Sequence, residues 1–207
     1  MKGRSIILDH VNGLEAAAYL VDGKLDDLLI DQTDAPRPGA IYRAICDRPI
    51  KGQGGMMLRL PDGDTAFLRA GKGLRQGQAL LVQVTGYAEG SKAVPVTDRV
   101  LFKSRYAIVT PGKPGLNISR QIVDEDIRDT LLAIAHKAHE GAHGLILRSS
   151  CETADPAEIA EDITAMLDLA DAVLADAEGD MPEALTEGDS PHVLAWRDWT
   201  GASEIVT

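Results

Sequence analysis

Turns interrupt the segment 40–97 so often that it has no room for a long helix. Short apolar stretches lie between loops rich in glycine, at residues 40–46, 55–60, 65–68, 79–84 and 93–96. None of them shows helical periodicity, and each is long enough for one strand. Short strands at this spacing are typical of a small closed barrel. We therefore predict a five-stranded barrel of the size of an OB fold in this part of the chain.

The residues before the barrel read as a second, simpler sheet. Between residues 5 and 31, the pairs Asn12-Gly13 and Asp22-Gly23 separate three apolar stretches. Asn-Gly and Asp-Gly favour two-residue hairpins, so we predict a three-stranded antiparallel meander. Two prolines and a glycine at 35–39 then end the meander, because proline does not continue a central strand.

The residues after the barrel are mostly helical by pattern. Apolar residues recur every three to four positions after Asp124 and again after Asp155, which we expect to be an N-cap followed by Pro156 in the first turn. A buried strand of four apolar residues that ends in Arg148 is expected within 144–150, and another strand at 106–109 precedes a loop rich in glycine and proline. Trp196 and Trp199 follow in the tail, where the pattern leaves open whether they pack on the meander or lie exposed.

Charge is spread unevenly along the chain, whose net charge is −11. Residues 1–35 carry a net −4, residues 36–120 a net +9, and residues 121–207 a net −16. A basic middle between acidic flanks is an electrostatic footprint for a polyanion, although an accident of composition would give the same count. The acidic residues of the last predicted helix lie off its apolar stripe and are typical of a solvated face.

Several protein classes are excluded by composition. No window holds 18 consecutive apolar residues, so no spanning helix is predicted, and the apolar run after the basic N-terminus is too short for a signal peptide. The two cysteines, Cys46 and Cys151, lie far apart, which fits a reducing cytoplasm and no metal knot.

No catalytic constellation stands out in the sequence. His136, His139 and His143 lie within eight residues, and the first two share a helical face, so a metal site is one interpretation. The favoured one is that histidines near a helix C-terminus are stabilised by the helix dipole. The acidic run 124–126 is likewise typical of a helix start.

Phe67 is the residue on which a binding surface depends. Thr65, Phe67 and Arg69 alternate to one side of their strand, and Ala66 and Leu68 to the other. Exposed aromatic residues on the middle strands of an OB barrel stack on bases, whereas the competing interpretation is a core phenylalanine. Polar neighbours on its own side favour the surface for Phe67. Met57 lies across the turn and is polarisable, but it stacks less well than a ring.

Several stretches, in order, resemble the ribonuclease E/G family. Tyr42-Arg43-Ala44, TAFLRA at 65–70, GQALLVQVT at 77–85 and GSKAVPVT at 90–97 resemble its OB-fold RNA-binding domain. SRYAIVTPGKPGLNISRQI at 104–122 and GLILRSS at 144–150 resemble its sensor of a 5′-monophosphate. LAWRDW at 194–199 and AAAYLVDGKLDDLLID at 16–31 are similar to parts of its ribonuclease-H-like subdomain.

The resemblance implies an α+β fold in four parts. These are a partial ribonuclease-H-like meander at 1–35, the OB-type barrel at 36–100, a small α/β sensor subdomain at 101–180, and a tail at 181–207 that returns to the ribonuclease-H-like part. It also implies site residues. RNA is expected to bind to Phe67, Met57, Lys92, Arg43 and Arg69. The 5′-phosphate is expected to bind to Arg148, Ser149, Ile108 and Arg120.

Three departures from the family pattern bear on these expectations. Met57 stands where the family has a second stacking phenylalanine, and Gln121 where it has a second arginine. Ser149 replaces a threonine and keeps the hydroxyl. The base platform is therefore expected to be weaker than in the family, with the phosphate site largely kept.

The function implied is binding of single-stranded RNA with 5′-monophosphate sensing, in the N-terminal part of a cytoplasmic endoribonuclease for RNA processing and decay. No catalytic residue, metal or cofactor is expected in this chain, because the family's Mg²⁺ and paired aspartates lie in a later domain. We expect a fragment of a longer enzyme; a natural truncation is the alternative. No membrane contact is expected, and an oligomer is possible in the full-length protein. The alternative functions are a non-catalytic RNA regulator or chaperone, and a protein-interaction domain that uses the acidic helices.

Overall fold

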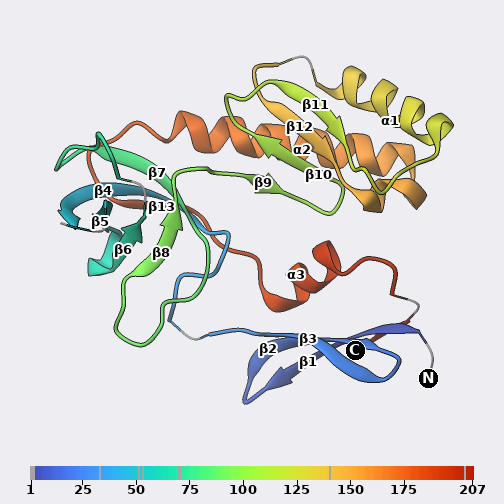
Figure 1. Ribbon diagram of the computed structural model, residues 1–207, viewed down its shortest axis with the longest axis horizontal. Coiled ribbons are helices and arrows are strands. Elements are labelled where there is room, and N and C mark those ends of the chain that lie inside the picture. Colours follow the sequence, from blue (N-terminus) through green and yellow to red (C-terminus); the bar gives the residue numbers. More distant parts are fainter. Residues whose placement is uncertain are drawn as a thin grey trace. The chain divides into compact units, whose positions relative to one another are not determined.

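The computed structural model describes residues 3–32, 34–50, 52, 54–69, 71–139, 141–202 and 204–207. They form two compact units. The first unit joins Met1–Arg99 to Ala177–Thr207, and the second is Val100–Asp176. The elements of each unit, labelled in Figure 1, mix sheets with helices and confirm the α+β class. The predicted limits between meander, barrel and tail fall inside the first unit.

The first unit contains the predicted OB-type barrel. Its strands are β4 (Ile41–Ile50), β5 (Gly55–Arg59), β6 (Thr65–Leu68), β7 (Ala79–Val84) and β8 (Val94–Thr97). They follow the order β4-β5-β6-β8-β7, and pairing of β4 with β7 closes the barrel. The pair β6–β8 is parallel, and the other pairs between these strands are antiparallel. One strand from the tail, β13 (Glu183–Thr186), is added beside the start of β4.

The interior of the barrel is built by alternation along each short strand. Leu58 and Ala66, which are cross-strand partners, are both fully buried, and so is Val82 on β7. Their outward neighbours stay partly exposed, because successive side chains of a strand point to opposite faces. The apolar pattern therefore fixes which face of each strand is available to a ligand.

The predicted meander is also present in the first unit. It consists of β1 (Arg4–Val11), β2 (Leu14–Val21) and β3 (Lys24–Ile30), paired antiparallel. Asn12-Gly13 and Asp22-Gly23 have φ values of 53°, 82°, 51° and 76°. Positive φ at both central residues is the geometry of a type I′ hairpin, which Asn-Gly and Asp-Gly favour.

The tail returns to this meander and resolves the question of the two tryptophans. Helix α3 (Pro191–Asp198) packs on β2, and β14 (Glu204–Val206) pairs parallel with β1. The Trp199 ring stacks on Tyr19 with centroids 5.3 Å apart, whereas Trp196 is 50% exposed. Only one of the two tryptophans therefore joins the small core under α3.

An ion pair follows β3 and gives a first testable prediction. Asp31 is 8% exposed and accepts hydrogen bonds from Arg37 Nε at 3.0 Å and from a second Arg37 nitrogen at 2.6 Å. These bonds from Arg37 hold the pKa of Asp31 below its ordinary value of 3.8. The charged carboxylate therefore stabilises the fold above that value, and the contribution is lost as pH falls below it.

Asp31→Asn is accordingly expected to lower the free energy of unfolding by about 1–2 kcal/mol at pH 7, because one charge-assisted pair is lost. Urea unfolding of the variant and the unchanged protein measures this difference, and repeating it at acid pH should show the two converging. A difference that stays constant down to pH 3 would contradict the assignment to ionised Asp31.

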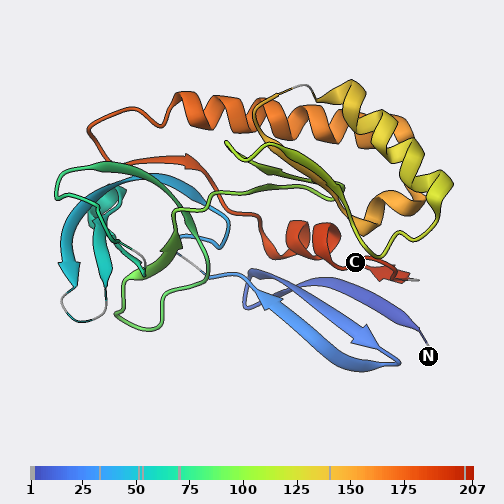
Figure 2. The same ribbon diagram turned by 45° about the horizontal axis from the view of Figure 1, so that its top comes forward.

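The second unit is a sheet with two helices. Its strands, in the order β11-β12-β10-β9, are β9 (Phe102–Lys103), β10 (Ala107–Thr110), β11 (Gly115–Ile118) and β12 (Gly144–Leu147). Helices α1 (Glu125–Ala138) and α2 (Pro156–Ala175) lie on the same side of this sheet in Figure 2. The predicted N-cap holds, since the Asp155 carboxylate accepts a hydrogen bond from the Ala157 N–H at 2.7 Å.

Two predictions about the second unit were wrong in detail. The loop after β10 contains a strand, β11, which pairs parallel with β12. Its four residues look like a loop in the sequence because only the distant β12 gives them a partner. The strand expected within 144–150, with its end at Arg148, ends one residue earlier at Leu147, and a short 3-10 helix (Ser149–Thr153) follows.

Candidate nucleic-acid interface

The outer face of β5, β6 and β8 carries a continuous apolar row. Met57 pairs with Phe67 across β5 and β6, and Phe67 pairs with Pro95 across β6 and β8. Ala66 and Leu68 are buried while Phe67 is partly exposed, so Phe67 lies on the outer side of its strand as the alternation predicts. We call Met57, Phe67 and Pro95 the platform.

Arginine side chains flank the platform. Arg48 on β4 pairs with Met57 and is 72% exposed. Arg59 pairs with Thr65 one row further along the same face, and Arg69 follows β6 at the other end; both are exposed. A partly exposed aromatic side chain between cations is an arrangement that suits a single-stranded nucleic acid, because the cations attract its phosphates and the ring can stack on its bases.

The two remaining residues predicted to bind RNA lie elsewhere. Lys92 is exposed in the turn before β8, where its Nζ lies 2.7 Å from a carboxylate oxygen of Glu89. This exposed pair is weak in water, so a phosphate competes with Glu89 for Lys92. Arg43 is 7% exposed; its Nε donates to the Met181 carbonyl at 2.9 Å and its guanidinium pairs with Glu183. The position of Arg43 therefore favours a structural role in joining β13 to β4 over contact with RNA.

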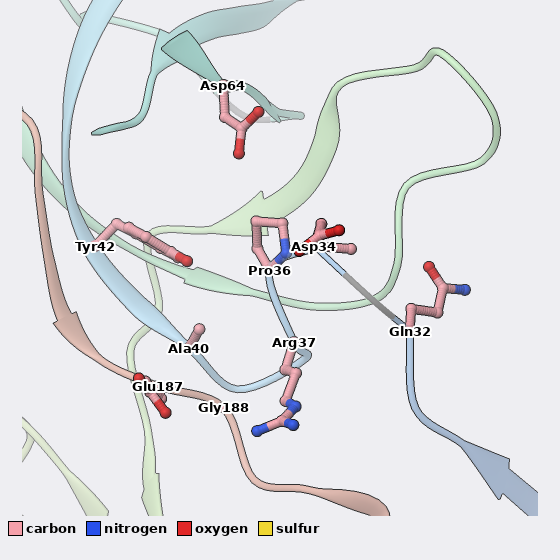
Figure 3. A pocket seen from close by; sticks show the side chains of 10 residues that line it. Gln32, Asp34, Pro36, Arg37, Ala40, Tyr42, Asp64, Glu187 and Gly188 are labelled. Carbon is pink, nitrogen blue, oxygen red and sulfur yellow. The ribbon is translucent and has the colours of Figure 1, made fainter. Parts of the chain in front are cut away.

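A pocket of about 360 Å³ on the first unit has the wrong charge for a polyanion (Figure 3). The pocket is lined by Tyr42, Asp64 and Glu187, among others. Arg37 also lines it, but the Arg37 guanidinium is hydrogen-bonded to the Asp31 carboxylate. Burial raises the pKa of Tyr42, and the carboxylates of Asp64 and Glu187 raise it further. The field in this pocket is negative, so a phosphate is better placed on the arginine-flanked face.

In the second unit, one edge of the sheet gathers the residues predicted to bind phosphate. Strands β11 and β12 are parallel, so their carboxyl ends meet at the same edge, and the Ser119 N–H donates to the Leu147 carbonyl at 2.8 Å. Arg120 follows Ser119, and Arg148 and Ser149 follow Leu147. Three of the four predicted residues therefore leave the sheet side by side.

Ile108 lies further from that edge. It pairs with Ile146, whereas the Arg148 N–H donates to the Tyr106 carbonyl at 2.9 Å. Two residues of strand separate Ile108 from the level of Arg148, which corresponds to about 7 Å. The pairing places Ile108 on β10, the strand adjacent to β12, but at the level of Ile146 and not at that of Arg148.

The loop under Arg148 is fixed by α2. The Arg148 guanidinium donates to the Ser104 carbonyl at 2.5 Å. Asp162 accepts hydrogen bonds from the Ser104 hydroxyl and from the Tyr106 N–H. This carboxylate holds the 104–106 loop, and with it the carbonyl that orients Arg148. Arg120 is exposed beside this edge.

A comparison with known families decides the classification. The model of the Ribonuclease E/G family matches residues 102–206, about half of the chain. The chain belongs to the ribonuclease E/G family. The match therefore covers nearly all of the second unit and of the tail.

Individual relatives agree with this membership. Ribonuclease G of Escherichia coli K12 is 33% identical over 89 residues, which cover 43% of this chain and 18% of the relative. Ribonuclease E of Nostoc sp. PCC 7120 is 29% identical over 126 residues, which cover 60% of this chain and 18% of the relative. Ribonuclease E of Synechocystis sp. PCC 6803 is 28% identical over 139 residues, covering 67% and 19%. The chain thus spans about a fifth of the length of these relatives.

Two of the three histidines weighed for a metal site have structural partners in this ribonuclease E/G family member. His139 contacts the His143 carbonyl at 2.7 Å, and the His143 ring lies 2.9 Å from Asp171. Within the described ranges, no three His, Cys, Asp or Glu side chains converge as a metal site. Cys151 is buried, and burial raises the pKa of its thiol to about 11, so it is no thiolate at neutral pH. Among the described residues, none of the helices is long and apolar enough to span a bilayer.

Sequence reasoning missed three members of the outer face. Arg59 could have been predicted, because this residue lies two positions after Met57 on the same strand and therefore shares its face. Arg48 was hidden by a bulge in β4 between Cys46 and Arg48, which shifts the register. Pro95 carried no local signal, since its place beside Phe67 depends on the parallel pair β6–β8.

Proposed function

We propose that this chain binds single-stranded RNA on the platform and recognises a 5′-monophosphate at the Arg148 edge, as part of a ribonuclease E/G-type enzyme of RNA processing. The observation that supports it most is the partly exposed Phe67 between Met57 and Pro95, with exposed arginines on both sides. Bases stack on such surfaces only when they are unpaired, so the ligand is a single strand.

Chemistry at the Arg148 edge supports the second half of the proposal. A guanidinium and a hydroxyl donate to phosphate oxygens, and residues with both kinds of donor, Arg148, Ser149 and Arg120, follow the adjacent ends of β11 and β12. The loop held by Asp162 orients Arg148 before a ligand arrives. Preorganised donors lose less entropy on binding, which favours recognition of a small terminal group.

Cleavage is assigned to the complete ribonuclease and to no residue described here. The resemblance assigns Mg²⁺-dependent cleavage to paired aspartates in a later domain of the family. The role proposed for this chain is to bind and orient the RNA. Its two cysteines are free and buried, which suits the reducing cytoplasm proposed for the enzyme.

Binding of a short fluorescent RNA, with a 5′-phosphate or a 5′-hydroxyl, tests the proposal directly. Each phosphate contact releases counterions, so raising salt fourfold is expected to weaken binding about 20- to 50-fold if three or four contacts form. The 5′-phosphate RNA is expected to bind more tightly than its hydroxyl counterpart, and a duplex of the same sequence more weakly. Absence of binding at low salt would refute the proposal and favour a protein-interaction role for the acidic helices.

A further inference from the structure

We infer that Gly55 is a positioning residue of the platform, whose missing side chain lets the Phe67 ring rest on the backbone of β5. The inference rests on the RNA-binding function proposed above. Gly55 begins β5, two residues before Met57, and is buried. Met57 pairs with Phe67 and Met56 with Leu68, so Gly55 lies diagonally across from Phe67.

The contact between the two residues leaves no space for a side chain. A Cβ built on Gly55 would lie 2.4 Å from Phe67 Cε2, 2.6 Å from Cζ and 2.9 Å from the Leu68 carbonyl oxygen. Real Cβ atoms essentially never approach other heavy atoms closer than 3.0 Å. The far edge of the ring therefore occupies the place where any other residue would carry its first carbon.

Backbone conformation gives no reason for glycine at this position. Gly52 and Gly54, just before it, have φ of 85° and 68°, in the region that favours glycine. Gly55 is not among the residues with positive φ and continues as an ordinary strand residue. What requires glycine at position 55 is thus the ring of Phe67, whose two contacts are the shortest, together with the Leu68 carbonyl oxygen.

The contact with Gly55 determines the orientation of the Phe67 ring on the platform. The contact with Gly55 holds the edge of the ring over β5, the strand that also carries Met57. An added methyl group would force the ring to rotate or lift, because a phenylalanine has only a few staggered positions to choose from. Met57 and Pro95 have no aromatic ring to replace it, so binding of bases should follow the placement of Phe67.

A purely structural role is the competing explanation. An aromatic side chain that covers a glycine on the neighbouring strand also stabilises a sheet. In that case Gly55→Ala lowers the melting temperature and leaves the RNA affinity of the folded protein unchanged. Affinity and stability therefore have to be measured on the same variants.

The test is a double-mutant cycle on RNA affinity with Gly55→Ala, Phe67→Ala and both together, using a single-stranded fluorescent RNA at fixed salt. Gly55→Ala is expected to weaken binding about 3- to 10-fold, and to have no further effect when Phe67 is already alanine. Gly188→Ala is the matched control, because its Cβ would lie 2.6 Å from the Arg37 Cβ and 2.6 Å from the Pro38 carbonyl oxygen, in the same unit. It strains this unit without contacting Gly55 or the platform and should leave affinity unchanged.

The outcomes separate the inference from the function on which it rests. If Phe67→Ala leaves affinity unchanged, the proposed function fails. If Phe67→Ala weakens binding and Gly55→Ala does not, or if Gly188→Ala weakens it equally, only the role of Gly55 is refuted.

Should Gly55→Ala not fold, Phe67→Leu removes the ring atoms that reach residue 55. G55A/F67L must then bind RNA as well as F67L alone. Weaker binding by the double variant would overturn the inference.

Discussion

Replacement of Phe67 by alanine is expected to weaken binding of single-stranded RNA about 10- to 100-fold at constant salt. The platform contains one aromatic ring, and its neighbours Met57 and Pro95 are aliphatic. Stacking of a base on an aromatic side chain contributes about 1–3 kcal/mol, and each 1.4 kcal/mol is a factor of ten in affinity. Because the platform has no second aromatic ring on which a base could stack, the loss of RNA affinity should fall in the upper part of that range.

Fluorescence anisotropy of a labelled oligonucleotide measures the loss. Phe67→Tyr is the conservative control and should retain most of the affinity, since the ring remains. Trp196→Ala is a matched control, because this aromatic residue is also partly exposed, at 50%, but belongs to α3 on the meander. Equal loss in the Trp196 and Phe67 variants would show that exposed aromatic surface in general, and not the platform, carries the binding.

Replacement of Arg148 by alanine is expected to reduce the preference for a 5′-monophosphate about 10-fold or more. The guanidinium is the partly buried donor at the edge formed by β11 and β12, where Ser149 and Arg120 also leave the sheet. A hydrogen bond to a charged group contributes about 1.5–3 kcal/mol, so its loss removes most of the discrimination. Binding of the 5′-hydroxyl RNA should change little, because that ligand lacks the terminal charge.

The readout for Arg148 is the ratio of two affinities, which a partial folding defect does not shift selectively. This matters because the guanidinium also donates to the Ser104 carbonyl, so its removal loosens the loop. Lys137→Ala removes an equal charge from the exposed end of α1 and should leave the ratio unchanged. An Arg148→Ala variant that folds and keeps the full preference would refute the phosphate site.

Much of the architecture was open to prediction because its causes are local. The hairpins at Asn12-Gly13 and Asp22-Gly23 follow from the φ that those residues adopt readily. The five barrel strands follow from short apolar stretches between glycines, and the outward position of Phe67 from simple alternation. The N-cap at Asp155 follows from its own side chain and the proline after it.

Other features depended on partners far away in the chain. Strand β11 exists because β12 lies beside it, although 25 residues and a helix separate them. Arg43 looks like a cation ready for a phosphate, but Glu183 and the Met181 carbonyl, from the distant tail, enclose it. No window of sequence around residue 43 contains that information.

Apart from strands such as β11, the sequence by itself determined the kinds of element and the two faces of each strand, since period and turn chemistry act within a few residues. Only the tertiary structure decided which outer faces adjoin. The parallel pair β6–β8 brings Pro95 beside Phe67, and a bulge in β4 pairs Arg48 with Met57. The Phe67 ring contacts Gly55 diagonally across from it on β5. Pairing between strands is set by closure of the whole barrel, so the binding surface appears only when every strand is in place.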